Sequence, residues 1–151
     1  MLNNASNILM DTANIVVWHP TFVSSREFPD VPIHVARCAS EAFQAAGIGA
    51  FIAAILMART TIEATAKSQA ITKGNLIAKI DAMASAQLIR PALREAAHAI
   101  RHLGNDMAHG DIEDPPAQVD AEDVLKLMAM ILTEVFEAAA LTKAIMERRA
   151  Q

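Results

Sequence analysis

Apolar side chains recur every three to four residues over most of this 151-residue chain. That spacing places them on one face of an α-helix, so the pattern predicts amphipathic helices rather than strands. Glycine and proline residues interrupt the pattern between the helices. The predicted helical segments are residues 30–46, 49–68, 75–84, 90–109 and 120–148. We therefore expect an all-α fold, an antiparallel four- to five-helix bundle with short connections.

The apolar faces of these segments also predict which side chains form the core. A bundle of this kind buries one stripe from each helix and leaves the opposite face in water. The expected core residues are Ile52, Ile55, Leu56, Ile80, Leu93, Ile100, Leu103, Val124, Met128, Ile131 and Val135.

Residues 1–30 do not share the helical period. Asn14–Trp18 is rich in β-branched residues and stops at His19-Pro20, which indicates a short extended stretch. Trp18 is expected to anchor this stretch in the core. We accordingly divide the chain into an irregular N-terminal segment, residues 1–30, and a helical bundle domain, residues 31–151.

The last segment, residues 120–148, is predicted to be one helix roughly 40 Å long. Asp120 is expected to cap it, with Asp123 completing a capping-box-like arrangement. Its apolar residues spread beyond one stripe and include Met130 and Leu141. The shorter helices cannot cover all of this surface, so we expect a homodimer.

Composition and charge limit the function classes. A net charge of −4 does not fit a generally basic nucleic-acid binder, so any such site must be a local patch. Cys38 is the single cysteine, which excludes an internal disulfide and a cysteine-based zinc site. No signal peptide is recognisable, and charged residues interrupt the longest apolar run. We expect a cytoplasmic protein with no membrane contact and no cofactor.

Segment 90–109 carries a concentration of cations and imidazoles. On a helical wheel its polar residues fall within one sector roughly 120° wide. They are Arg90, Arg94, His98, Arg101, His102, Asn105 and His109. A simpler interpretation is also open, in which this face is only solvated, Gly104 ends the helix and Asn105 caps the next turn.

Arg59 and Glu63 lie within the apolar stripe of segment 49–68. Unpaired charges on the core side of a helix are costly, so both side chains need polar partners. Either they pair with each other, or Glu63 reaches toward Arg101 or His109 and orients it. We expect both side chains to be buried and coupled to the Arg101–His109 segment.

The order of several motifs resembles a known family. Arg101-x-x-Gly104-Asn105-x-x-Ala108-His109 is similar to the signature of the bacterial family called domain of unknown function 4145. That family is a branch of the HEPN (higher eukaryotes and prokaryotes nucleotide-binding) superfamily. The resemblance implies a HEPN-like bundle and a place in a prokaryotic defence or stress system. Further matches, over residues 17–140, are Val17-Trp18-His19-Pro20, Glu41-Ala42, Arg59-x-x-Ile62-Glu63 and Leu76-x-x-Lys79-Ile80.

One function that the resemblance implies is metal-independent RNA cleavage at a dimer interface. His109 would transfer protons and Arg101 would stabilise charge on the phosphate. Asn105 would hold a phosphate oxygen or the loop, and Arg59 with Glu63 would orient the cations. Seven residues separate Arg101 from His109, whereas RNA-cleaving members of the superfamily have four to six.

The alternative is a non-catalytic module that binds RNA, a nucleotide or a protein at the same residues. The long Arg101–His109 spacing and the negative net charge favour this second reading. Arg90, Arg94 and His98 would then contact phosphates, with His102 in a supporting role. No metal is expected, because arginines crowd the histidine-bearing face and would repel a cation.

Overall fold

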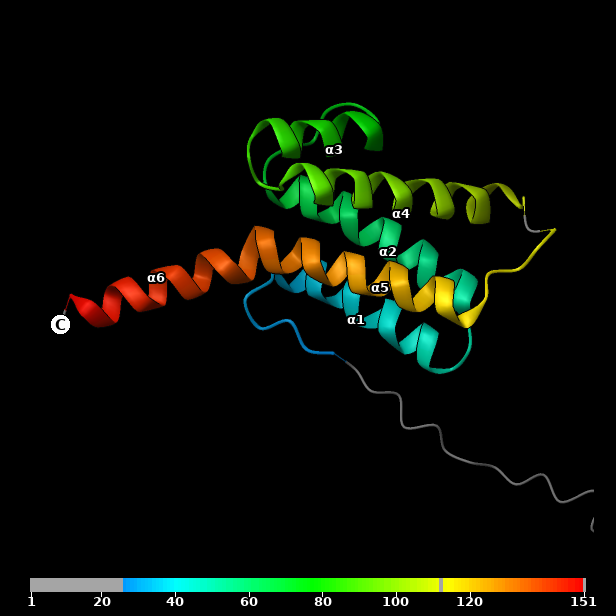
Figure 1. The fold of residues 1–151 in the computed structure, drawn as a ribbon, viewed down its shortest axis with the longest axis horizontal. Helices are drawn as coiled ribbons and strands as arrows, with labels where there is room; N and C mark the ends of the chain where they lie inside the picture. Colours follow the sequence, from blue (N-terminus) through cyan, green and yellow to red (C-terminus); the bar gives the residue numbers. More distant parts are fainter. Residues whose placement is uncertain (1–25, 112, 151) are drawn as a thin grey trace, which may run out of the picture.

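The computed structural model describes residues 26–111 and 113–150. Every regular element within these ranges is a helix, which confirms the all-α prediction. The extended stretch expected at Asn14–Trp18, with its proposed anchor Trp18, lies outside the described residues. The elements, shown in Figure 1, are α1 (Ile33–Gly47), α2 (Phe51–Ser68), α3 (Leu76–Ser85), α4 (Pro91–His109), α5 (Gln118–Leu132), η2 (Thr133–Glu137) and α6 (Ala138–Arg149).

The first four helices begin and end at residues with strong local preferences. Pro32 precedes α1, and the side chain of Asn75 caps α3 by accepting a hydrogen bond from the backbone N–H of Ala78 at 3.0 Å. Pro91 opens α4, where its missing N–H costs nothing. Gly110 ends α4 at a φ of 77°, a left-handed conformation that glycine adopts easily. These boundaries therefore lie within three residues of the predicted ones.

The central helix of the bundle is α2, which contacts α1, α3, α4 and α5. Helices α1, α2, α4 and α5 run in alternating directions, as the colour gradient in Figure 1 shows. The short helix α3 packs on α2 and α4 at one side of the bundle. Of the described helices, none is both long and apolar enough to cross a membrane.

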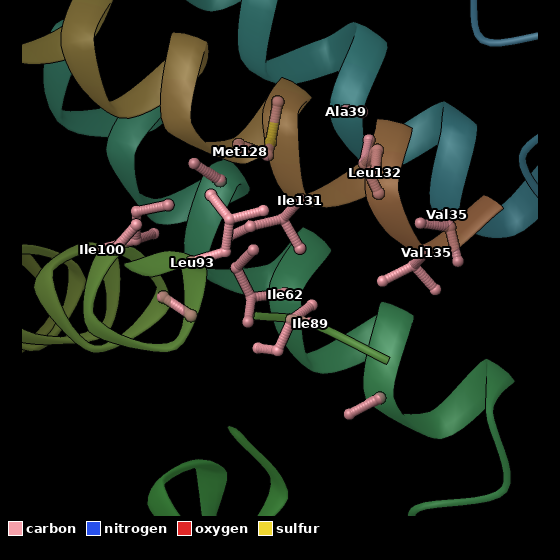
Figure 2. Close-up of a cluster of buried hydrophobic side chains, with 14 of the residues drawn as sticks. Val35, Ala39, Ile62, Ile89, Leu93, Ile100, Met128, Ile131, Leu132 and Val135 are labelled. Carbon is pink, nitrogen blue, oxygen red and sulfur yellow. The ribbon is translucent and has the colours of Figure 1, made fainter. Parts of the chain in front are cut away.

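The core forms where α1, α2, α4 and α5 face one another. Figure 2 shows side chains from these helices meeting there, with Ile62 of α2 near Leu93 of α4 and Ile131 of α5. All three of these side chains are buried. The predicted core residues that are confirmed as buried are Ile55, Ile80, Leu93, Ile100, Val124, Met128, Ile131 and Val135.

Three predicted core positions lie closer to the surface. Ile52 and Leu56 are half-buried, and the prediction for Leu103 is wrong, because its exposed fraction is 37%. The buried face of α4 passes through Ile100 and Gly104, and Leu103 lies at the edge of that face.

The predicted long last helix is present, with a π-helical turn, η2, between α5 and α6. It begins at Gln118, and the predicted cap at Asp120 with Asp123 is wrong. Asp120 instead lies in the first turn, where its carboxylate accepts a hydrogen bond from the backbone N–H of Ala117 at 2.8 Å. Alanine has no capping side chain, so the sequence did not mark this start. No residue of α6 is buried, and α6 extends beyond the bundle in Figure 1.

Candidate functional site

Gly104 lies inside α4 rather than at its end. Because α4 runs unbroken from Pro91 to His109, the interpretation of Gly104 as a helix terminus followed by an Asn105 cap is wrong. The side chain of Arg59, from α2, lies over the buried Gly104. A Cβ on residue 104 would be 2.6 Å from Cδ and 2.7 Å from Cβ of Arg59. The missing side chain therefore lets α2 and α4 approach closely.

Arg59 and Asn105 connect α2 to α4. Arg59 Nε donates a hydrogen bond to Oδ1 of Asn105 at 2.9 Å, although the two residues are 46 positions apart. Arg59 is half-buried, with its aliphatic stem over Gly104 and its guanidinium group at Asn105. The expected coupling of Arg59 to the 101–109 segment is therefore present. Nδ2 of Asn105 makes no hydrogen bond to the described residues and can donate to a ligand.

Glu63 does not join this site. Its Oε1 accepts a hydrogen bond from Lys79 Nζ at 2.8 Å and lies 3.2 Å from Lys67 Nζ. The hydrogen bond from Lys79 is the main reason that the pKa of Glu63 is lowered, and Lys67 adds to it. The expectation that Glu63 pairs with Arg59 or reaches Arg101 is wrong, because α3 brings a cation closer. Lys79 is only 5% exposed, so Glu63 compensates a buried charge.

Arg101 is a buried arginine without a counter-ion. It is 9% exposed, and its Nε is buried with no hydrogen-bond partner in the described part of the chain. One terminal nitrogen, Nη2, lies 2.6 Å from His102 Nε2. A guanidinium group only donates, so His102 must accept with Nε2 and carry its proton on Nδ1. No carboxylate among the described residues lies within 4.0 Å of Arg101 or of Arg59.

The other predicted phosphate-binding cations have carboxylate partners. Arg94 Nη2 and His98 Nε2 lie 2.7 and 3.0 Å from the same oxygen of Asp81 on α3. The hydrogen bond with His98 is the main reason that the pKa of Asp81 is lowered, and the contacts with Arg94 add to it. Arg90 Nε lies 3.2 Å from Glu134 in η2, whose carboxylate also accepts from the Arg90 backbone N–H at 2.7 Å. These three side chains attach α3 and η2 to α4.

His109 is the last residue of α4 and is exposed. It lies eight positions after Arg101 along one continuous helix, which corresponds to roughly 12 Å of rise and roughly 80° of rotation. The predicted pair therefore does not converge within one chain. Arg101 and His109 can act on one phosphate only if a second subunit contributes one of the two side chains.

Three charged partners were not predicted from the sequence: Lys79 for Glu63, Asp81 for Arg94 and Glu134 for Arg90. One signal was available for Lys79, which directly precedes Ile80 on the apolar side of α3. No comparable signal marked Asp81 and Glu134, because their pairing with Arg94 and Arg90 depends on how α3 and η2 pack against α4.

The residues that converge are Arg59, Arg101, His102 and Asn105, which we call the Arg101 corner. Arg101 and Asn105 are one helical turn apart and so lie on one face of α4. The corner combines two guanidinium groups without carboxylate partners and one free amide donor, which suits an anion. Among the described residues, no three His, Cys, Asp or Glu side chains are grouped so that they could hold a metal ion.

Comparison with known proteins identifies the family of the chain. The family model for a domain of unknown function, DUF4145, matches residues 40–149, which includes every member of the Arg101 corner. Neither the curated proteins nor the solved structures contained a match to the chain. Since the family model covers well over half of the chain, this protein belongs to the DUF4145 family.

Proposed function

We propose that this protein is a HEPN-like, non-catalytic module that binds the phosphate groups of RNA or a nucleotide at the Arg101 corner, within a prokaryotic defence or stress system. The observation that carries this proposal is the buried guanidinium group of Arg101, which has an unpaired Nε and no carboxylate partner in the described chain.

Burial without a counter-ion is expensive for an arginine. Removing a charge from water costs several kcal/mol unless an opposite charge or hydrogen bonds replace the lost hydration. A phosphate would supply both at the Arg101 corner, since its oxygens match the fork of a guanidinium group. Arg59 supplies a second uncompensated cation to the same corner, and Asn105 supplies an amide donor.

Binding without turnover fits the positions of the histidines. His109 lies two helical turns from Arg101, and His102 uses Nε2 to accept from Arg101. Within one chain, His109 is therefore not beside the Arg101 guanidinium group, and Nε2 of His102 is already occupied by it. Neither imidazole is placed for proton transfer at a phosphate that Arg101 binds. Cleavage through Arg101 and His109 of two subunits is the alternative that the experiment must separate.

The test is the affinity for a short fluorescent single-stranded RNA, measured by anisotropy at low and at moderate salt. Arg101→Gln removes the charge, whereas Arg101→Lys keeps the charge but loses the fork. The matched control is Arg37→Gln, which removes one exposed arginine from α1. We expect Arg101→Gln to abolish binding, Arg101→Lys to weaken it and Arg37→Gln to leave it nearly unchanged. Equal affinities of Arg101→Gln and Arg37→Gln would overturn the proposal.

The same RNA, incubated with the protein and a metal chelator, tests for turnover. An intact RNA supports a binding module. Cleavage that His109→Ala abolishes would instead establish the nuclease alternative, because only catalysis needs a proton-transfer group at that position.

A further inference from the structure

The Arg101 corner holds two positive charges that only neutral groups contact. Nη2 of Arg101 lies 2.6 Å from Nε2 of His102, which must be unprotonated to accept its hydrogen bond. Nε of Arg59 donates to the amide oxygen of Asn105 at 2.9 Å. No carboxylate among residues 26–111 and 113–150 lies within 4.0 Å of either guanidinium group. A ligand that balances this corner therefore has to bring two negative charges.

The phosphate groups of an RNA do not all carry the same charge. A phosphodiester inside the chain carries one negative charge, which would balance one guanidinium group and leave the other uncompensated. A phosphomonoester at a chain end carries about −1.5 to −2 near pH 7 and offers three acceptor oxygens. The terminal group can therefore balance both arginines at once.

The burial of Arg101 also favours the end of a chain. Arg101 is only 9% exposed, whereas its contact His102 is exposed. An internal phosphate has a ribose on each side, and both must stay near the surface while the phosphate reaches an almost buried group. A terminal phosphate has one ribose and can approach end-on. A nearly buried cation is thus easier to reach for a terminal phosphate than for an internal one.

We propose that the Arg101 corner recognises a terminal phosphomonoester, the 5′- or 3′-phosphate of an RNA or the phosphate of a nucleotide, in preference to an internal phosphodiester. This inference rests on the function proposed above and adds which kind of phosphate is bound. Arg101 and Arg59 balance the two negative charges, and Nδ2 of Asn105 donates to one of the oxygens. The phosphate takes the place of His102 as the acceptor for Arg101.

The test compares the affinities of the full chain for RNAs of one sequence that differ only at their ends. Each RNA carries a fluorophore on an internal base and has a 5′-phosphate, a 3′-phosphate or hydroxyl groups at both ends. We expect at least one phosphorylated RNA to bind about tenfold more tightly than the hydroxyl-ended RNA, as one or two additional charge-assisted hydrogen bonds provide. The phosphorylated form that gains affinity identifies the end that is recognised. Competition by adenosine 5′-monophosphate, with adenosine as its control, shows whether a free nucleotide is also a source.

Asn105→Asp tests the charge balance without removing a side chain. The new carboxylate keeps the contact with Arg59 and supplies one of the two missing negative charges. The preference for a phosphorylated end should therefore disappear. Gln44→Glu, at an exposed position on α1, makes the same change in net charge and should keep the preference.

Two results would overturn this inference and leave phosphate binding itself intact. One is equal affinity of the wild type for hydroxyl-ended and phosphorylated RNAs. The other is an Asn105→Asp protein that prefers phosphorylated ends as strongly as the Gln44→Glu protein does. If the wild type binds none of the RNAs and no nucleotide, both this inference and the proposed function are wrong.

Discussion

Arg59 lies directly over Gly104, so close that a single methyl group on residue 104 would be 2.6 Å from Arg59 Cδ. This contact brings α2 against α4 and places the Arg59 guanidinium group where it can reach Asn105. The contact between these two helices thus depends on the absence of one side chain.

Gly104→Ala should destabilise the protein by about 1–2 kcal/mol. Alanine favours a helix by about 1 kcal/mol over glycine, but the new Cβ would clash with Arg59 Cβ, which cannot swing away, and overpacking of this kind costs about 1–3 kcal/mol. Urea unfolding measures the difference. Ala99→Gly, on the exposed side of α4, serves as the control for helix propensity alone. A more stable Gly104→Ala protein would show that the close contact carries no cost.

Arg59 and Asn105 should show a coupling free energy of about 1–2 kcal/mol in a double-mutant cycle, the range for a hydrogen bond that involves a charged group. The cycle uses Arg59→Met, Asn105→Ala and the double variant, with unfolding free energies as the readout. The control cycle replaces Asn105→Ala with Asp106→Ala, at an exposed neighbour. Equal coupling in both cycles would contradict a specific hydrogen bond.

Glu63→Ala should cost more stability than Lys79→Met. The first change leaves the buried ammonium group of Lys79 without its carboxylate. The expected loss of unfolding free energy is about 2–3 kcal/mol. It is smaller than for breaking a fully buried pair, because Glu63 is partly exposed. The second removes the buried charge itself and leaves Glu63 paired with Lys67. Thermal or urea unfolding of both variants checks the order. If Lys79→Met is the more destabilising change, the Glu63–Lys79 ion pair stabilises the fold beyond neutralising the buried charge of Lys79.

Stability should fall in acid partly through Glu63. The pKa of this carboxyl group is lowered in the folded chain from its ordinary value of 4.5. Its ionisation therefore stabilises the fold fully above pH 4.5 and ceases to do so as the pH falls through the lower folded value. We expect the melting temperature of the Glu63→Gln, Lys79→Met double variant to fall less steeply below that pH than the wild-type melting temperature. Parallel curves would assign the acid sensitivity to other carboxylates.

Asp81→Asn should strengthen RNA binding if the Arg101 corner binds phosphate, because the change releases Arg94 and His98 on the same helix. Each added phosphate contact should also steepen the dependence of affinity on salt by about one unit of slope. Glu122→Gln, at an exposed position on α5, makes the same change in net charge without releasing a cation. An equal gain from both variants would indicate a general charge effect rather than two freed contacts.

The sequence by itself determined the helices and most of the core. Their signals are local: the spacing of apolar residues, Asn75 as a cap, Pro91 in a first turn and Gly110 at a helix end. Each acts within about one helical turn, so no knowledge of the packing is needed to interpret it. The motifs that resemble the family also include Arg59, Arg101 and Asn105, and so they mark these three residues as candidates for the functional site without any knowledge of the fold.

Only the tertiary structure decided which charges remain free. Arg94 and Arg101 look alike on the helical wheel of α4, yet Arg94 meets Asp81 and Arg101 meets no carboxylate among the described residues. The difference arises because α3 packs against α4 at Arg94 and brings Asp81 there. The position of α3 also explains why Glu63 pairs with Lys79. Gly104 shows the same dependence, since its role follows from an Arg59 side chain 45 positions away rather than from its neighbours. Such pairings depend on helix crossing geometry, which is set by the packing of whole faces and not by any local pattern.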